Sequence, residues 1–199
     1  MNTAICREED RLRANFYGLL AALLGGPPAD ETLRLLDGIQ ADAGVDEPLA
    51  HCWREVQAQA AQRSVDQLEK EYQRLFIGLG RGEVVPYASW YLSGRLMDKP
   101  LARLRGDLAL LGIERRPEIR ETEDHVAALC ETMALISGSE TAVSQERRQN
   151  FYRRHLASWM PRFFADLQAA PSARFYRAVG RLGEKFIARE AILFIGTPE

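Results

Sequence analysis

The sequence predicts an all-α protein. Apolar residues recur at helical spacing along nearly the whole chain, no segment alternates apolar and polar residues as a strand would, and the helical stretches end at glycine or proline. A chain of 199 residues is long enough to bury a sizeable core. We therefore expect a single domain over residues 1–199, built as a bundle of roughly ten helices.

The expected helices begin near the N-terminus. The first has an apolar stripe made of Leu12, Phe16, Leu19, Leu20 and Leu23. It closes at the run from Gly25 to Pro28, because no helix continues through Gly-Gly-Pro-Pro. A second helix should follow Asp30, and Trp53 anchors a third.

The sequence Ser64-Val-Asp-Gln67 predicts the start of a fourth helix. This is a capping-box pattern, in which the serine and glutamine side chains satisfy backbone groups at a helix start. The helix would carry a stripe made of Leu68, Tyr72, Leu75 and Phe76. Glycines at positions 78, 80 and 82 then end it. Their helical spacing alone indicates that these side chains pack in the core.

The second half of the chain continues the pattern. A helix from Pro100 to Leu111 should stop at Gly112, and the polar connector at 115–122 is a candidate hinge. The helix that follows should end at Gly138, and Pro161 must break or kink the one after it. A last long helix begins after Pro171.

Composition excludes several classes of protein. Lys and Arg number 26 against 28 Asp and Glu, without a basic block interleaved with aromatics, so nucleic-acid binding is disfavoured. The three cysteines are scattered and lack metal-site spacing, which fits reduced thiols in the cytosol. No apolar run reaches membrane-spanning length and no signal core is evident. We expect a cytoplasmic protein without stable membrane insertion.

An aromatic segment follows the glycines. In GRGEVVPYASWY, the residues Pro86, Tyr87, Trp90 and Tyr91 do not all fit one helix stripe. They would line a groove for a peptide, or fold inward as a loop that plugs the bundle. The sequence leaves both interpretations open.

Acidic residues lie close in sequence to two features. Glu69 and Glu71 precede the aromatic segment, whereas Glu121, Glu123 and Asp124 surround His125. Carboxylates beside an apolar groove would suit an apolar peptide that carries arginines, because guanidinium groups pair bidentately with carboxylates. The alternative is a solvated acidic face.

Asp124 and His125 are the most suggestive polar pair. With Thr122 as the expected N-cap, both should lie in the first turn of a helix. Neighbouring residues of a helix diverge, so the two do not form a catalytic dyad. No nucleophile or metal-binding set accompanies them, and a hydrolase is therefore the least favoured class.

The motifs together resemble a known family. The run EYQRLFIGLGRGEVVPYASWY is similar to a segment of the TorD/DmsD family of redox-enzyme maturation chaperones, relatives of the NarJ group. The matching positions are Tyr72, Leu75, Phe76, Gly78, Pro86, Tyr87, Ser89 and Tyr91. A second signature resembles the run from Glu121 to His125, with Thr122 in place of a proline. The C-terminal runs FYRRHLASWM and ARFYRAVGRL also look like family helices.

The resemblance implies an all-helical chaperone without catalytic activity. Members bind the twin-arginine signal peptide or N-terminal region of a molybdoenzyme, assist cofactor insertion and delay export until the client has folded. The residues expected to contact the peptide are Tyr72, Leu75, Phe76, Pro86, Tyr87, Trp90, Tyr91, Glu121, Glu123, Asp124 and His125. Asp124 and His125 would have a polar or hinge role.

The resemblance also bears on cofactors and oligomeric state. The resemblance implies no resident cofactor, and it leaves open a transient contact with the molybdenum cofactor or a guanine nucleotide. The protein would be a monomer or a homodimer. The leading alternative function is a helical small-molecule-binding or regulatory domain, in which the aromatic segment closes over a ligand.

Overall fold

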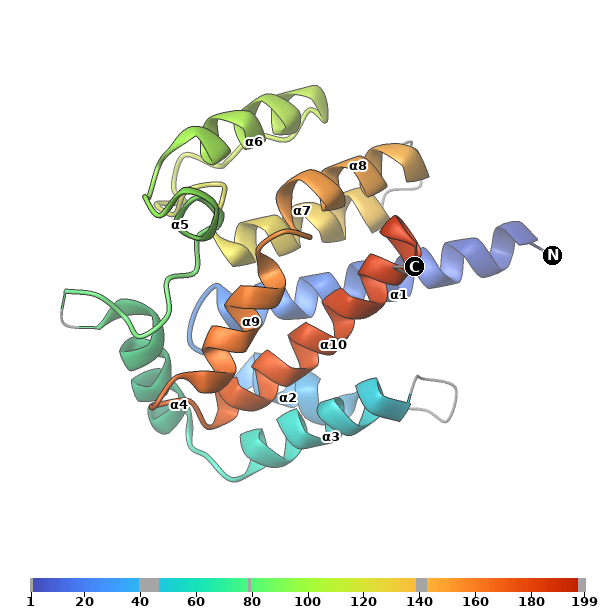
Figure 1. Ribbon diagram of the computed structural model, residues 1–199. Coiled ribbons are helices and arrows are strands. Elements are labelled where there is room, and N and C mark those ends of the chain that lie inside the picture. The colour runs from blue at the N-terminus through green and yellow to red at the C-terminus, as the bar shows by residue number, and fades with distance from the viewer. Residues whose placement is uncertain (1, 40–46, 79, 139–142, 197–199) are drawn as a thin grey trace. The chain divides into compact units, whose positions relative to one another are not determined.

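The computed structural model describes residues 2–39, 47–78, 80–138 and 143–196 (Figure 1). In these ranges every regular element is helical, and the only bridge of β type pairs Tyr87 with His125. The elements are α1 (Asn2–Leu24), α2 (Asp30–Gly38), α3 (Glu47–Ala61), α4 (Val65–Tyr72), a π-helical turn η1 (Gln73–Ile77), α5 (Ala88–Ser93), α6 (Lys99–Leu110), α7 (Val126–Gly138), α8 (Gln145–His155), α9 (Met160–Ala169) and α10 (Phe175–Ile195). The all-α prediction is confirmed. Among the described helices, none is long and apolar enough to cross a membrane.

The chain groups into two compact units, and each unit is assembled from two separate segments. The first unit contains Met1–Gly25 and Tyr87–Trp159, and the second contains Gly26–Pro86 and Met160–Glu199. The candidate hinge at residues 115–122 falls inside the first unit, between α6 and α7. Hinge motion at that connector stays a prediction.

In the first unit, α1 packs along α7, α8 also packs on α7, and α5 packs on α6. The buried side chains of α1 include Tyr17, Leu20 and Leu24, and α7 buries residues on nearly every side, including Leu129 and Met133. A helix with apolar residues all round must be covered by neighbours. This explains why α7 is central to the unit.

In the second unit, α10 is the central helix and packs on α9, α3 and α4 (Figure 1). Gly183 lets α9 approach closely, because a Cβ at that position would overlap the ring of Phe164. The stripe that contains Phe175, Val179 and Leu182 is buried as its spacing indicates.

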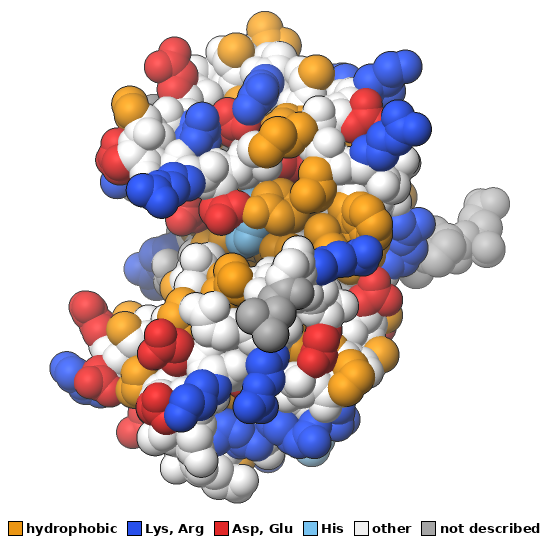
Figure 2. Space-filling model, turned by 90° about the vertical axis from the view of Figure 1, so that its left-hand side faces the viewer, with side chains coloured by type: hydrophobic (Ala, Val, Ile, Leu, Met, Phe, Trp, Pro, Cys, Tyr) orange, Lys and Arg blue, Asp and Glu red, His pale blue; other side chains and the backbone are white. Residues whose placement is uncertain are grey.

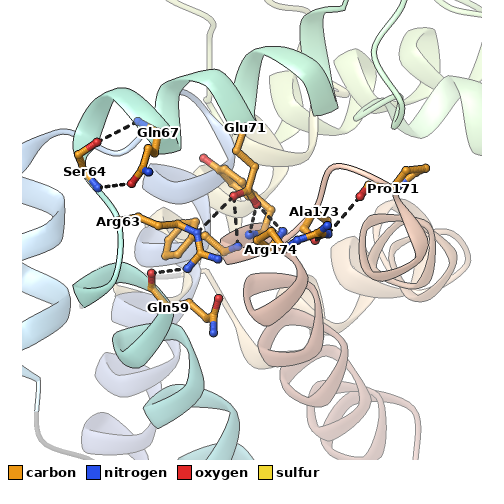
Figure 3. A network of polar contacts seen from close by, with 10 residues as sticks. Gln59, Arg63, Ser64, Gln67, Glu71, Pro171, Ala173 and Arg174 are labelled. Atoms are coloured by element: carbon orange, nitrogen blue, oxygen red, sulfur yellow. Dashed lines mark hydrogen bonds and ion pairs between the residues drawn. The ribbon is translucent and has the colours of Figure 1, made fainter.

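The N-terminus of α10 is capped by a residue distant in sequence. Arg174 at the N-cap offers no side-chain cap. Instead the carboxylate of Glu71 accepts hydrogen bonds from the backbone N–H groups of Arg174, Phe175 and Tyr176, at 2.8, 3.3 and 2.8 Å (Figure 3). Glu71 is only 6% exposed, and Arg63 lies 3.9 Å from its carboxylate. The position of Glu71 in the sequence favoured a carboxylate that lines a groove. In the structure, Glu71 is buried and caps α10 instead.

Local signals in the sequence were accurate at most helix ends. The capping box at Ser64 and Gln67 is present, with both hydrogen bonds formed. The helix broken near Pro161 separates into α8 and α9. Gly78, at the end of η1, has φ of 63°, a left-handed conformation that glycine adopts without strain.

Two local expectations were wrong. The segment expected as a loop contains the helix α5, which starts at Ala88 because a carboxylate from another segment binds its first turn. Asp124 and His125 do not lie in a first helical turn, since α7 begins at Val126. His125 is instead held in an extended pairing with Tyr87.

Replacing Glu71 with alanine should lower the free energy of unfolding by about 2–4 kcal/mol, because buried N–H groups at the start of α10 lose their acceptor. Urea denaturation would measure this change. Glu69→Ala, at an exposed position of the same helix, is the matched control and should change stability by less than about 0.5 kcal/mol. Equal stability of the two variants would contradict the capping role.

Candidate functional site

The candidate site is built where the start of α5 meets the segment before α7. The N–H of Ala88 donates to the carbonyl oxygen of Asp124 at 2.9 Å, within the bridge between Tyr87 and His125. The N–H of Ser89 donates to the Asp124 carboxylate at 3.0 Å. The two sequence signatures that looked independent are therefore joined by backbone contacts in the first unit.

Asp124 organises this junction. It is 1% exposed, and each carboxylate oxygen has a donor: Ser89 N–H on one, and the Thr122 hydroxyl at 2.6 Å on the other. Thr122 stands where the resembling signature has proline, and it supplies a hydroxyl donor that proline lacks. Because both oxygens are engaged, Asp124 positions the site and offers no free oxygen to a ligand.

His125 is buried and held in one orientation. Its ring meets the Tyr87 ring edge-on, with centroids 5.1 Å apart. Its Nδ1 accepts the N–H of Ala127 at 3.2 Å, which assigns the proton of the neutral ring to Nε2. Burial lowers the pKa of His125, and the opposing effects of Glu121 and Asp124 do not restore it. The ring is therefore neutral near pH 7.

The two glutamates of the signature are already engaged by the protein's own side chains. Glu121 accepts a hydrogen bond from the Tyr87 hydroxyl. Glu123 binds two guanidinium groups, from Arg105 at 2.9 Å and from Arg115 at 3.3 Å. Burial raises the pKa of Glu123, but the hydrogen bond and charge of Arg105, together with Arg115, lower it overall. The Glu123 carboxylate thus pairs with two arginine side chains of the protein itself.

The helix α5 and its N-cap residue carry the aromatic residues of the site. Tyr87, Trp90 and Tyr91 are all half-buried. The Tyr91 ring lies 5.5 Å from the ring of Trp159, which is fully buried and donates to the His155 carbonyl at 2.6 Å. Tyr91 is thus held on one side by the core of the first unit, and a part of each ring stays accessible.

The other predicted contact residues belong to the second unit. Tyr72, Leu75, Phe76 and Pro86 are buried there. The rings of Tyr72 and Phe76 are 4.8 Å apart, and each packs on the ring of Tyr176, at 5.8 and 5.3 Å. These residues form part of the core of that unit.

Sequence reasoning missed the arginines that hold Glu123 and the hydroxyl that holds Asp124. Arg105 lies on an expected helix face and Arg115 in a polar connector, so neither stood out among the other charged residues. Arg115 had one signal, its place six residues before Glu121 in the acidic run. Arg105 lies 18 residues from Glu123 in sequence and had no such signal. Within the described ranges, no group of three or more His, Cys, Asp or Glu could hold a metal ion.

Comparison with known proteins agrees with this architecture. The family model described as nitrate reductase delta subunit matches residues 42–165, more than half of the chain. The chain belongs to this family, the NarJ/TorD family. The resemblance stated from the sequence is confirmed.

Relatives of this family member are named chaperones, not enzymes. The chaperone protein TorD of Photobacterium profundum is 28% identical over 179 residues, covering 84% of this chain and 82% of the relative. TorD of Psychrobacter is 34% identical over 113 residues, 51% of this chain and 50% of the relative. TorD of Vibrio cholerae is 26% identical over 133 residues, and the match spans 60% of its length.

A solved structure shares the fold. The crystal structure of a protein described as a redox enzyme maturation protein, from Archaeoglobus fulgidus, aligns with a TM-score of 0.62. The alignment covers 88% of this chain and 93% of that chain, at 18% identity. The TorD-like all-α fold expected from the sequence is confirmed.

The buried, neutral state of His125 predicts acid sensitivity. Above its ordinary pKa of about 6.5, the His125 ring is uncharged in both the folded and the unfolded protein. As the pH falls through that value, the ring binds a proton in the unfolded chain but stays neutral in the folded protein, where its pKa is lower. Stability should therefore fall from about pH 7.5 to about pH 5.5. His155, whose pKa burial also lowers, adds to the fall.

Thermal melting of His125→Gln over that range would check this prediction. The fall in melting temperature should be smaller in this variant than in the unaltered protein. His51→Gln, at an exposed position, is the control and should keep the full fall. An unchanged fall in His125→Gln would mean that the histidine does not contribute.

Proposed function

We propose that this TorD-family protein binds the twin-arginine signal peptide or N-terminal region of a molybdoenzyme, assists insertion of its cofactor and delays its export until folding is complete. The observation that carries the proposal is Glu123, a carboxylate that binds two guanidinium groups, together with Glu121, which contacts the half-buried Tyr87. A peptide with two arginines and an apolar stretch has the matching chemistry.

Fewer polar residues are proposed to contact the peptide than the sequence suggested. Glu121 and Glu123 are the arginine receptors, since their partners at the site are partly exposed side chains that a ligand can displace. Asp124 and His125 act as positioning residues, because their hydrogen bonds fix the start of α5.

The apolar part of the contact rests on Tyr87, Trp90 and Tyr91, whose rings are partly accessible. Tyr72, Leu75, Phe76 and Pro86 stay in the proposal as apolar contacts of the second unit. Leu75 is fully buried, so a peptide reaches it only after neighbouring side chains rearrange. Two or three aromatic anchors supply much of the roughly −8 kcal/mol of a micromolar complex.

The cellular setting belongs to the same proposal. We place the protein in the cytoplasm, as a monomer or homodimer, with a molybdoenzyme client and without a resident cofactor. A client that is exported must be released, and a micromolar affinity permits this release. Transient contact with the client's molybdenum cofactor, or with a guanine nucleotide, would occur during maturation.

Calorimetric titration with synthetic twin-arginine signal peptides from molybdoenzymes of the same genome would test the proposal. One peptide should bind at micromolar concentration, and its version with both arginines changed to lysine should bind about tenfold more weakly, since lysine lacks the bidentate geometry. Tyr87→Ala and Tyr91→Ala should each weaken binding while the melting temperature shows a folded protein. If no peptide binds at high micromolar concentration, the proposal fails and a small-molecule ligand becomes the favoured alternative.

The arginines that hold Glu123 should compete with the peptide. Replacing both Arg105 and Arg115 with alanine should raise peptide affinity by about fivefold. Each partly exposed ion pair with Glu123 stabilises the peptide-free protein by up to about 1 kcal/mol, and the peptide must exchange it. Arg116→Ala is the matched control, since this exposed arginine pairs with no carboxylate in the described structure. Weaker binding after the double replacement would show that peptide arginines do not use Glu123.

A further inference from the structure

The helix α6 is held in the first unit by a narrow apolar face. It buries three of its 12 residues, namely Leu101, Leu104 and Leu108, at spacings of three and four. Its other residues are exposed or half-buried. By contrast, α7 buries eight of its 13 residues. Because its apolar face is so small, the attachment of α6 depends on each further contact that it makes.

Two sets of ion pairs supply such contacts. In Arg105, Nη2 and Nε lie 2.9 and 3.0 Å from the Oε2 atom of Glu123. The Asp107 carboxylate contacts α8, at 2.6 Å from Nε2 of His155 and 3.1 Å from Nη1 of Arg154. The Arg105 side chain is 52% exposed, and Figure 2 shows other basic and acidic side chains next to each other at the surface. A pair with this exposure is weak and open to exchange.

A glycine in the middle of α6 weakens the helix itself. A Cβ at Gly106 would meet no atom within 4 Å beyond its chain neighbours and the backbone of its own helix, so packing does not require glycine there. Glycine inside a helix favours the unfolded conformation when compared with alanine. A short helix with such a residue opens by local unfolding more readily than its neighbours do.

Opening of α6 would change the interior of the unit. A cavity of about 430 Å³ is lined by Lys99, Pro100, Arg103 and Leu104 of α6, together with residues from α5, α7 and the end of α8. The lining from α7 includes Leu129, which is fully buried. When α6 opens, the cavity therefore loses one wall and its apolar lining meets water.

We propose that Glu123 couples the peptide site to α6. When a guanidinium group of the bound peptide takes the place of Arg105 at Glu123, the carboxylate stays paired, but α6 loses one of the two sets of ion pairs that hold it. Opening of α6 then becomes more frequent. Arg115, which follows α6 in the chain, is the second partner of Glu123, so its exchange frees the adjoining connection as well. The inference rests on the proposed function for the arginines of the peptide.

Hydrogen exchange of the backbone amides in α6, followed by mass spectrometry, tests the coupling. Binding of the twin-arginine peptide should speed this exchange by about two- to fivefold, the effect of losing one partly exposed ion pair. Arg105→Ala should produce a similar increase without peptide, and the peptide should then add little. Arg103→Ala is the matched control, because this exposed arginine of α6 has no ion pair in the described structure. It should leave the exchange unchanged.

The outcomes separate the coupling from the proposed function. A peptide that binds without faster exchange in α6 would overturn the coupling and leave the proposed function in place. Equal exchange in Arg105→Ala and Arg103→Ala would overturn it too. If no peptide binds, the proposed function fails and the peptide is not the trigger, whereas faster exchange in Arg105→Ala would still show that the pair with Glu123 holds α6.

Gly106→Ala gives an independent measurement of the opening. Alanine stabilises the helix, so exchange in α6 should slow by about fivefold both with and without peptide. The ratio between the two rates should stay the same, because Arg105 and Glu123 are unaltered. Unchanged exchange in this variant would show that these amides exchange without opening of α6, and the inference would be overturned.

Discussion

Buried carboxylates that receive backbone N–H groups from a distant segment are the constraint on which both units depend. Glu71 binds the start of α10, and Asp124 binds the start of α5. Each carboxylate sits at a helix N-terminus, where exposed N–H groups and the helix dipole favour negative charge. Because α10 is the central helix of the second unit, fixing its first turn fixes the position of α9, α3 and α4 against it.

The same constraint separates residues that build the site from residues that are free to bind. Asp124 and His125 resemble functional residues when the sequence is viewed alone. In the structure, however, Asp124 binds the backbone of α5 and His125 packs against the Tyr87 ring. The groups left for recognition are those with exchangeable partners, above all Glu123. Rigid support behind an exchangeable contact suits the peptide binding and release that we propose for this protein.

Much of the fold was predictable because its signals are local. The apolar stripes, the capping box at Ser64 and the breaks at glycine and proline identify most helices. The helix α5 was missed, since its start depends on a carboxylate supplied 35 residues later in the chain. Burial of Glu71 was missed for the same reason: its partners lie more than 100 residues away. For the site, the sequence indicated the acidic run but not the arginines that pair with Glu123.

The arrangement of the chain has a consequence for its synthesis. Because the second unit combines Gly26–Pro86 with Met160–Glu199, the ribosome must deliver the last segment before that unit can form its core. Until α10 emerges, Glu71 has no backbone partners and the surfaces of α3 and α4 that α10 covers face water. Contacts between such distant segments slow folding. A chaperone of this design completes its second unit only after α10 has been synthesised, and until then the surfaces that α10 will cover are open to aggregation.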